Sequence, residues 1–470
     1  MFQGLTFRYF CKMKLLLLFI SVFNFTVYGQ SYNNLELLDN WKDDNLITNS
    51  LKNRYNECYG FVIHGKEYAT IGSSEGTHFF KINNQIKLEE IDFVRGRFSN
   101  ANVVHRDYKT FKNLLYAVCD EGESSLQIID LQYLPDSVHL VADLANDFGR
   151  NHNIAIDSIN ELLYCFSQTI IAGGIPTNAY SMRVYTLADP LNPTLVFNGF
   201  TDFPNVHDGV IRNNMAILNC GFDGLRRYDF SIPTSPSFLQ NMSIYQQQGY
   251  NHQGDLNPKG DVYIFADETP GKKLKKCRVA PDGEITIESY FGTDIQNESV
   301  PHNIMLDDRF AYVAYYNSGL RIFDYQSSPV EEVAFYDTYP DDNTNKMNGL
   351  WGVYSRLPSG RILASDRKYG LFLFDFNKDV FINRTKANFQ VYPNPIEYGQ
   401  DLTIFLNENY KGFLKLRLLD LSGKEVFHTS VSMQNYLVIN PKIESGMYHL
   451  EISFEQNLEI VTKRKTILVF

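Results

Sequence analysis

The sequence predicts an all-β protein, a seven-bladed β-propeller followed by a small antiparallel β-sandwich. A degenerate strand pattern recurs about every 45–50 residues, with Gly, Asp and Asn in the intervening turns, which is typical of propeller blades. Aromatic residues are abundant, with 30 Tyr and 35 Phe, and such residues pack well on pleated strands. No helical periodicity competes within the repeats. Because the chain has 470 residues, we expect more than one domain.

Residues 1–29 are typical of a signal peptide. Basic residues, including Arg8 and Lys12, precede an apolar run at 15–27, and Gly29 offers a small residue for cleavage. The alternative is a membrane anchor, but a helix needs about 20 apolar residues to span a bilayer, and this run is shorter. We therefore expect the segment to be removed, and no later stretch is long and apolar enough to span a membrane.

Charge and cysteine content narrow the class of protein. The net charge is -11, and without a basic patch we expect no nucleic-acid partner. After the signal peptide five cysteines remain, an odd number without a CxxC pair. This content favours small buried hydrophobic residues over a disulfide framework.

The predicted propeller covers residues 34–380. The last repeat lacks a fourth strand of its own, whereas residues 34–39 form a strand pattern without a repeat of its own. We expect this segment to complete the last blade and close the ring, which removes an open sheet edge. The third strand of the repeat reads Leu-Gln-Ile-Ile-Asp-Leu at 126–131, with copies at 182–187, 225–230, 320–325 and 371–376.

These third-strand phrases resemble the LVIVD repeat. The order of the motifs is also similar to the choice-of-anchor B family of secreted proteins, with His-Asn-Ile at 152–154 and 302–304 and Trp-Gly-Val-Tyr at 351–354. The resemblance covers about residues 34–380. It implies a propeller fold and an exported location, and it brings no established reaction.

The C-terminal part changes in pattern. Residues 381–388 are predicted to be a linker, and 389–470 contains alternating strands such as 402–406 and 414–420, with a hairpin turn at 422–424. This spacing predicts an antiparallel sandwich.

Several motifs of this domain resemble the type A sorting domain of type IX secretion substrates. They are Tyr-Pro-Asn-Pro at 392–395, Gly-Met-Tyr at 446–448 and the closing strand at 465–469. The resemblance implies that residues 389–470 engage the type IX secretion machinery of a Gram-negative bacterium. The protein would then be secreted or held at the outer-membrane surface. The alternative is an accessory carbohydrate-binding sandwich.

Histidines recur in phase with the repeat. Five of the ten histidines occupy one position, at the start of successive first strands. First strands line the channel of a propeller, so we expect these imidazoles to converge near one mouth. Tyr59 and Trp351 are predicted at the same position of the first and last repeats. The five in-phase histidines are His105, His152, His207, His252 and His302.

Imidazole is a good ligand for zinc, copper or iron, so the five histidines are candidate metal ligands. Asp107, Asp208 and Asp255 lie close to them in sequence and are candidates for the carboxylates that hydrogen-bond to the imidazoles and orient them. The alternative is a polar or water-filled ring that satisfies buried backbone groups.

Two functions follow from these observations. The first is a secreted or cell-surface binding module with a histidine-lined central channel and a protein or glycan ligand. The second is a metal-dependent enzyme whose metal is held by the channel histidines. The sequence contains no Gly-x-Ser-x-Gly elbow, phosphate loop or Rossmann fingerprint. It therefore assigns no catalytic residue, organic cofactor or substrate.

Overall fold

The computed structural model describes residues 32–203, 205–293, 299–341, 347–378, 381, 389–406, 413–432, 436–456 and 459–470. The predicted signal peptide and most of the predicted linker lie outside these residues. The chain forms two compact units, the first with Leu37–Phe374 as its body and the second with Asp375–Phe470. Among the described residues, no helix is long and apolar enough to cross a membrane.

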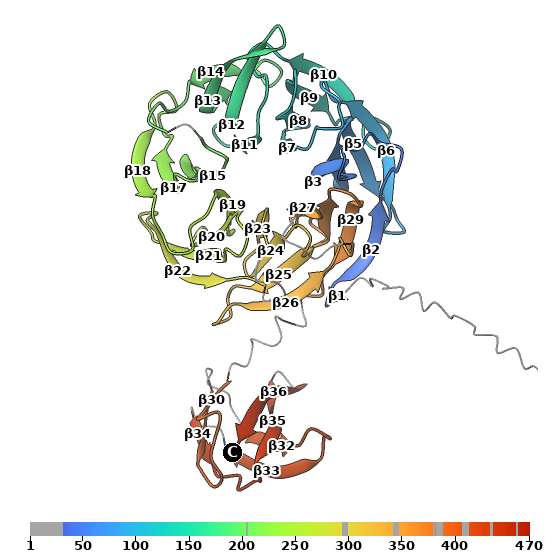
Figure 1. The fold of residues 1–470 in the computed structure, drawn as a ribbon. Coiled ribbons are helices and arrows are strands. Elements are labelled where there is room, and N and C mark those ends of the chain that lie inside the picture. The colour runs from blue at the N-terminus through green and yellow to red at the C-terminus, as the bar shows by residue number, and fades with distance from the viewer. Residues whose placement is uncertain are drawn as a thin grey trace, which may run out of the picture. The chain divides into compact units, whose positions relative to one another are not determined.

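Within the described residues, the first unit contains seven antiparallel sheets arranged in a circle (Figure 1). Each sheet is a blade, and its first strand is the innermost, as expected for a propeller. Blade 1 contains β3 (Tyr55–Ile63), β4 (Lys66–Ser73), β5 (Gly76–Ile82) and β6 (Leu88–Arg95), and blade 2 contains β7 (Arg106–Phe111), β8 (Leu114–Cys119), β9 (Leu126–Asp130) and β10 (His139–Leu144).

The next three blades repeat this order. Blade 3 contains β11 (Asn153–Asp157), β12 (Leu162–Ala172), β13 (Ile175–Thr186) and β14 (Thr194–Phe197), blade 4 contains β15 (Asp208–Arg212), β16 (Met215–Asn219), β17 (Leu225–Asp229) and β18 (Ser237–Met242), and blade 5 contains β19 (Asn251–Leu256), β20 (Val262–Asp267), β21 (Leu274–Val279) and β22 (Ile285–Phe291).

The last two blades take strands from the N-terminal part of the chain. Blade 6 contains β23 (Ile304–Leu306), β24 (Phe310–Ala314), β25 (Leu320–Asp324) and β26 (Glu331–Tyr336), with β1 (Tyr32–Asn33) beside β26, and blade 7 contains β27 (Leu350–Tyr354), β28 (Ile362–Asp366) and β29 (Gly370–Asp375), with β2 (Glu36–Trp41) beside β29.

The strand predicted at 34–39 therefore completes the last blade, as β2 (Figure 1). The amide of Asn40 donates to the carbonyls of Tyr369 and Leu371 at 3.0 and 3.1 Å. The ring of Trp41 packs edge-on against Phe80 of blade 1, with centroids 4.7 Å apart. The closing strand thus joins blade 7 to blade 1. The additional strand β1 was not predicted.

The blades are held together by apolar side chains packed between neighbouring sheets. Tyr164 and Phe166 of blade 3, for example, share one buried cluster with Leu218 and Tyr228 of blade 4. Because each blade buries its faces on its neighbours, the ring needs no cofactor for closure. As predicted, the five described cysteines are buried and free of disulfides: Cys58, Cys119, Cys165, Cys220 and Cys277.

The second unit is the predicted sandwich. Its core includes Leu402, Leu416, Leu450 and Ile467, each fully buried. The three-stranded sheet consists of β30 (Phe389–Tyr392), β31 (Leu402–Leu406) and β34 (Tyr436–Ile439), and the four-stranded sheet of β33 (Glu425–Ser432), β32 (Phe413–Leu419), β35 (Gly446–Gln456) and β36 (Glu459–Val469).

Candidate functional site

The five in-phase histidines lie at the start of the first strands of blades 2 to 6. The backbone amides of His152, His207 and His302 each donate to a carbonyl of the neighbouring second strand, at 3.1, 2.7 and 2.8 Å. His252 and Trp351 instead occupy register shifts in the ladders of blades 5 and 7. A β-bulge changes the direction of a side chain. Side chains therefore reach the ring in two ways, from a regular strand start in blades 3, 4 and 6 and from a bulge in blades 5 and 7.

The side chains of these residues form a closed ring, hereafter the histidine ring. Consecutive imidazoles contact one another, and the indole of Trp351 completes the circle between His302 and His105. Because blade 1 contributes no side chain to the ring, the large indole bridges its sector. The centroid distances are 4.9 Å for His105–His152, 4.2 Å for His152–His207, 4.1 Å for His207–His252, 4.3 Å for His252–His302, 4.1 Å for His302–Trp351 and 5.1 Å for Trp351–His105.

Blade 1 departs from the predicted phase. Cys58 pairs with Ile71 in blade 1, and Arg106 pairs with Cys119 at the equivalent position of blade 2. The residue before Cys58, Glu57, is therefore the equivalent of His105. The predicted residue, Tyr59, lies two residues further along the strand. A register shift between Tyr55 and Cys58 makes this difference invisible to simple spacing.

The ring of Tyr59 packs against Tyr354, with centroids 5.0 Å apart, outside the histidine ring. Glu57 packs beside Gly352, where any Cβ would clash with its carboxylate.

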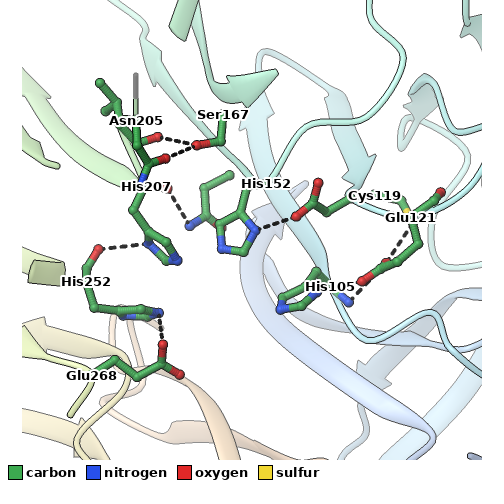
Figure 2. Close-up of polar contacts among 12 residues, drawn as sticks. His105, Cys119, Glu121, His152, Ser167, Asn205, His207, His252 and Glu268 are labelled. Atoms are coloured by element: carbon green, nitrogen blue, oxygen red, sulfur yellow. Dashed lines mark hydrogen bonds and ion pairs between the residues drawn. The ribbon is translucent and has the colours of Figure 1, made fainter. Parts of the chain in front are cut away.

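The histidine ring lines a cavity of about 370 Å³, hereafter the upper cavity. Figure 2 shows His105, His152, His207 and His252 gathered around one space. The remaining lining residues are Trp351, His302, Asp120, Ser167, Asn205, Tyr250 and Glu268.

Two imidazoles are oriented by carboxylates. Nδ1 of His105 lies 2.6 Å from Oε1 of Glu121 (Figure 2). Nδ1 of His152 lies 2.8 Å from Oδ2 of Asp120. An ionised carboxylate can only accept a hydrogen bond, so Nδ1 of each imidazole carries the proton. In the neutral ring Nε2 then keeps its lone pair.

Two further imidazoles are oriented by backbone carbonyls. Nδ1 of His207 donates to the carbonyl of His252 at 2.9 Å, and Nδ1 of His302 donates to the carbonyl of Trp351 at 2.7 Å. In these rings too, Nε2 is left as the acceptor. The imidazole of His252 is buried, and the backbone of His302 is the hydrogen-bonding group beside it.

Glu268 is the carboxylate nearest to the buried side of the ring. Its two oxygens lie 3.9 Å from Nε2 of His252 and 3.9 Å from Nε2 of His302. The hydroxyl of Tyr316 donates to Oε1 of Glu268, which fixes the carboxylate in place.

The sequence prediction missed Glu268, Asp120 and Glu121. Glu121 and Glu268 occupy equivalent positions of their blades. Arg106, next to His105, pairs with Cys119, and Glu121 lies two residues after Cys119. Gln253, next to His252, pairs with Ala266, and Glu268 lies two residues after Ala266, so this repeated position was the available signal.

The imidazoles of the ring differ in pKa, because burial and neighbouring charges act on them differently. Burial, reinforced by neighbouring imidazoles, holds the pKa of His207 and His302 well below the usual value. Burial lowers the pKa of His252 to about 4. For His152 burial acts in the same direction, but the hydrogen bond and charge of Asp120 outweigh it and raise the pKa. One side of the ring is therefore held as neutral imidazole.

The three aspartates predicted to support the histidines lie elsewhere. Asp107, Asp208 and Asp255 line a second cavity of about 400 Å³, hereafter the lower cavity, further along the same first strands. Asp107 pairs with Lys109 at 2.9 Å, and Asp255 pairs with Arg356 at 2.5 Å.

Asp208 accepts from the amide of Gly209 at 2.6 Å. The aspartates follow the histidines by one to three residues, and that offset moves them to a different depth of the channel.

The lower cavity is rich in buried carboxyl groups. Burial, with a contribution from Asp107, raises the pKa of Glu57 to about 8, and burial raises the pKa of Asp208 to about 7. The side-chain amide of Asn303 donates to Glu57, and that of Asn153 donates to the carbonyl of His207 at 3.2 Å. These groups form a polar layer beneath the histidine ring.

Comparison with protein families identifies the second unit. Residues 390–468 match the family described as "Secretion system C-terminal sorting domain". The chain therefore carries a type IX sorting domain, and the protein is secreted or displayed at the cell surface of a Gram-negative bacterium.

Comparison with solved structures concerns the first unit. The β-propeller domain of Cps50 (Swd1) from Myceliophteria thermophila is similar, with a TM-score of 0.50 and 8% identity over 72% of this chain and 98% of that chain. A functionally unknown protein from Desulfotomaculum acetoxidans gives a TM-score of 0.44 and 10% identity over 59% of this chain and 85% of that chain. No curated protein matches the chain. The first of these similarities supports the propeller fold alone.

Proposed function

We propose that this protein is an exported propeller that binds a transition-metal ion in its upper cavity, at His252, Glu268 and His302. This set is hereafter the buried site. The observation that carries the proposal is the spacing of its donor atoms. Both imidazole Nε2 atoms lie 3.9 Å from a Glu268 oxygen, which is too long for a hydrogen bond. Ligands bound at about 2.0–2.2 Å to one ion stand roughly 3–4 Å apart.

The donor types favour zinc, iron or copper. Two imidazoles and one carboxylate are borderline ligands that these ions accept, and three protein ligands leave a coordination position open. His252, Glu268 and His302 line the upper cavity, where a small ligand would have room beside a bound ion.

The surroundings match those of a metal site. The carbonyl of Trp351 fixes the tautomer of His302, and the Tyr316 hydroxyl holds Glu268. Such outer contacts orient ligands in metalloproteins. Because the imidazoles are neutral near pH 7, protons do not compete strongly for their nitrogens.

The resemblance of the repeats to the LVIVD repeat and the choice-of-anchor B family supports an exported propeller and assigns no reaction. Two roles remain compatible with a bound ion: a metal-dependent enzyme, or a binding module whose protein or glycan ligand contacts the ion. The open coordination position supports both.

The test is metal content of the purified full-length protein. The apo-protein is loaded separately with zinc, copper and iron, dialysed, and measured by elemental mass spectrometry. We expect retention of at least one equivalent of one metal, and its loss in the double variant His252→Ala, His302→Ala. The matched control is His139→Ala, an exposed histidine on β10, which should retain the metal.

Failure of the wild-type protein to retain any of the three metals, or equal retention in the double variant, would reject the metal site. Circular dichroism of each variant checks that the propeller is folded.

A further inference from the structure

We propose that the upper cavity binds a second metal ion, held by His105 and His152 with Asp120 beside them. This set is hereafter the rim site, and with the buried site it makes the upper cavity a two-metal centre. The inference rests on the proposed function, because it assigns a second ion to the same cavity. Within the described residues, two groups bring possible ligand atoms within 4.8 Å of one another, His105–Asp120–His152 and His252–Glu268–His302.

The rim site has the local environment of a metal-binding histidine pair. Each Nδ1 is occupied by a carboxylate, Glu121 for His105 and Asp120 for His152. Proteins use this carboxylate–histidine arrangement to fix the tautomer and to make Nε2 a stronger donor. In Figure 2 the rings of both histidines face the space shared with His207.

The two groups are not joined through a shared imidazole. His207 separates the two groups, with ring centroids 4.2 Å from His152 and 4.1 Å from His252. An imidazole bridges two metals only through both nitrogens, and Nδ1 of His207 already donates to the carbonyl of His252. His207 can therefore supply one Nε2 to one ion and does not bridge the two sites.

The charge of the cavity suits two cations. Glu268 lies beside the buried site, whereas Asp120 and Glu121 lie beside the rim site. Three carboxylates would partly offset the charge of two divalent ions.

The two sites differ in access. The side chains of His105 and His152 are 28% and 15% exposed, whereas those of His252 and His302 are each 3% exposed. Solvent and chelators therefore reach the rim site first. We expect the rim ion to bind last and to leave first.

The experiment is copper titration of the full-length apo-protein, followed by elemental analysis and electron paramagnetic resonance. The wild-type protein should bind two equivalents of Cu(II), and dipicolinate should remove one of them quickly. Binding of the second equivalent should broaden the signal of the first, because the two unpaired electrons are close.

Variants separate the two sites. His105→Ala with His152→Ala should bind one equivalent, without broadening and with the slowly removed fraction intact. Asp120→Asn, which keeps both imidazole ligands but weakens the orientation of His152, should lower the affinity for the second equivalent roughly 10- to 100-fold. His139→Ala should behave as the wild-type protein.

One equivalent in both the wild-type protein and the rim variant would overturn the second site and leave the buried site standing. Loss of all copper from the folded rim variant would show a single shared site, which also overturns the two-metal centre. Absence of copper, zinc and iron from every protein would instead reject the proposed function.

Discussion

The two cavities of the axial channel share the first strands of blades 2 to 7, and the lower cavity also uses that of blade 1, yet the two differ in chemistry. The upper cavity is lined by five imidazoles and an indole. The lower cavity is lined by Glu57, Asp107, Asp208 and Asp255, with Lys109 and Arg356 as the cations. A step of only one to three residues along a strand separates each aspartate from its ring histidine. Glu57, at a register shift in blade 1, reaches the lower cavity from the ring position itself.

This difference teaches that phase, more than proximity in sequence, decides which side chains meet in a propeller channel. Rotational repetition brings equivalent positions to one level, while the rise along a strand, about 3.3 Å per residue, moves the next positions to another level. A residue beside a ring histidine in the sequence is therefore excluded from the ring. Four predictions follow from this comparison.

The largest effect is expected for Glu268→Gln, which removes the carboxylate of the buried site while keeping its shape. We expect the dissociation constant for the tightly held metal to rise roughly 100-fold or more, since one of three ligands loses its charge. Competition with a chromophoric chelator measures the change.

Tyr316→Phe is a milder variant at the same site, because it removes only the hydroxyl that donates to Glu268. A loss of about 10-fold is expected. Equal metal affinity in wild type and Glu268→Gln would show that the carboxylate is not a ligand.

The second prediction concerns the stability of the lower cavity. The folded-state pKa of Glu57 is raised to about 8, so its ionisation opposes folding once the pH exceeds the unfolded value. The penalty is absent below about pH 4.5 and complete above about pH 8. Glu57→Gln should therefore raise the free energy of unfolding by about 1–3 kcal/mol at pH 9 and change it little at pH 4.

Urea unfolding at the two pH values tests this. Glu67→Gln offers a control carboxyl on the neighbouring strand β4. A stability gain at pH 4 as large as that at pH 9 would mean that ionisation is not the cause.

The third prediction uses the apo-protein in the presence of a chelator. The pKa of His207 is well below the usual value in the folded state, so below about pH 6.5 the unfolded chain takes up a proton that the folded protein refuses. Stability is retained above that pH and lost as the pH falls. His207→Gln should reduce this loss by about 1 kcal/mol per pH unit between pH 6 and 5. Parallel unfolding curves for variant and wild type across this range would contradict it.

The smallest effect is expected for Asp107→Asn and Asp255→Asn. If the aspartates belong to the lower cavity, metal affinity in the upper cavity should change by less than about twofold, within the range of distant, independent sites. A tenfold loss would show that they support the histidines after all.

Much of the architecture could be predicted from the sequence. The repeat of the second and third strands predicted seven blades, and the isolated strand at 34–39 predicted the closure of blade 7 by β2. The in-phase spacing of His105 to His302 predicted their meeting, because equivalent positions of a repeat share one level.

The remaining details depend on side-chain direction and on bulges, which spacing does not record. The bulge near Glu57 displaced the predicted position of Tyr59 by two residues. Glu268 follows a second strand and reaches the ring from a neighbouring turn, so proximity in sequence gave no sign of it. The three aspartates were predicted to support the histidines because they are close to them along the chain. In the structure they lie at another depth of the channel.

The pairing of β2 with β29 has a consequence for folding. These strands are separated by more than three hundred residues, so β2 finds its partner only when the last strand of the ring has been made. Contacts of such long range carry a large loop-closure entropy and slow folding. Until β2 pairs with β29, blade 7 lacks its outer strand and the ring is open between blade 7 and blade 1. We therefore expect ring closure to be a late step of folding.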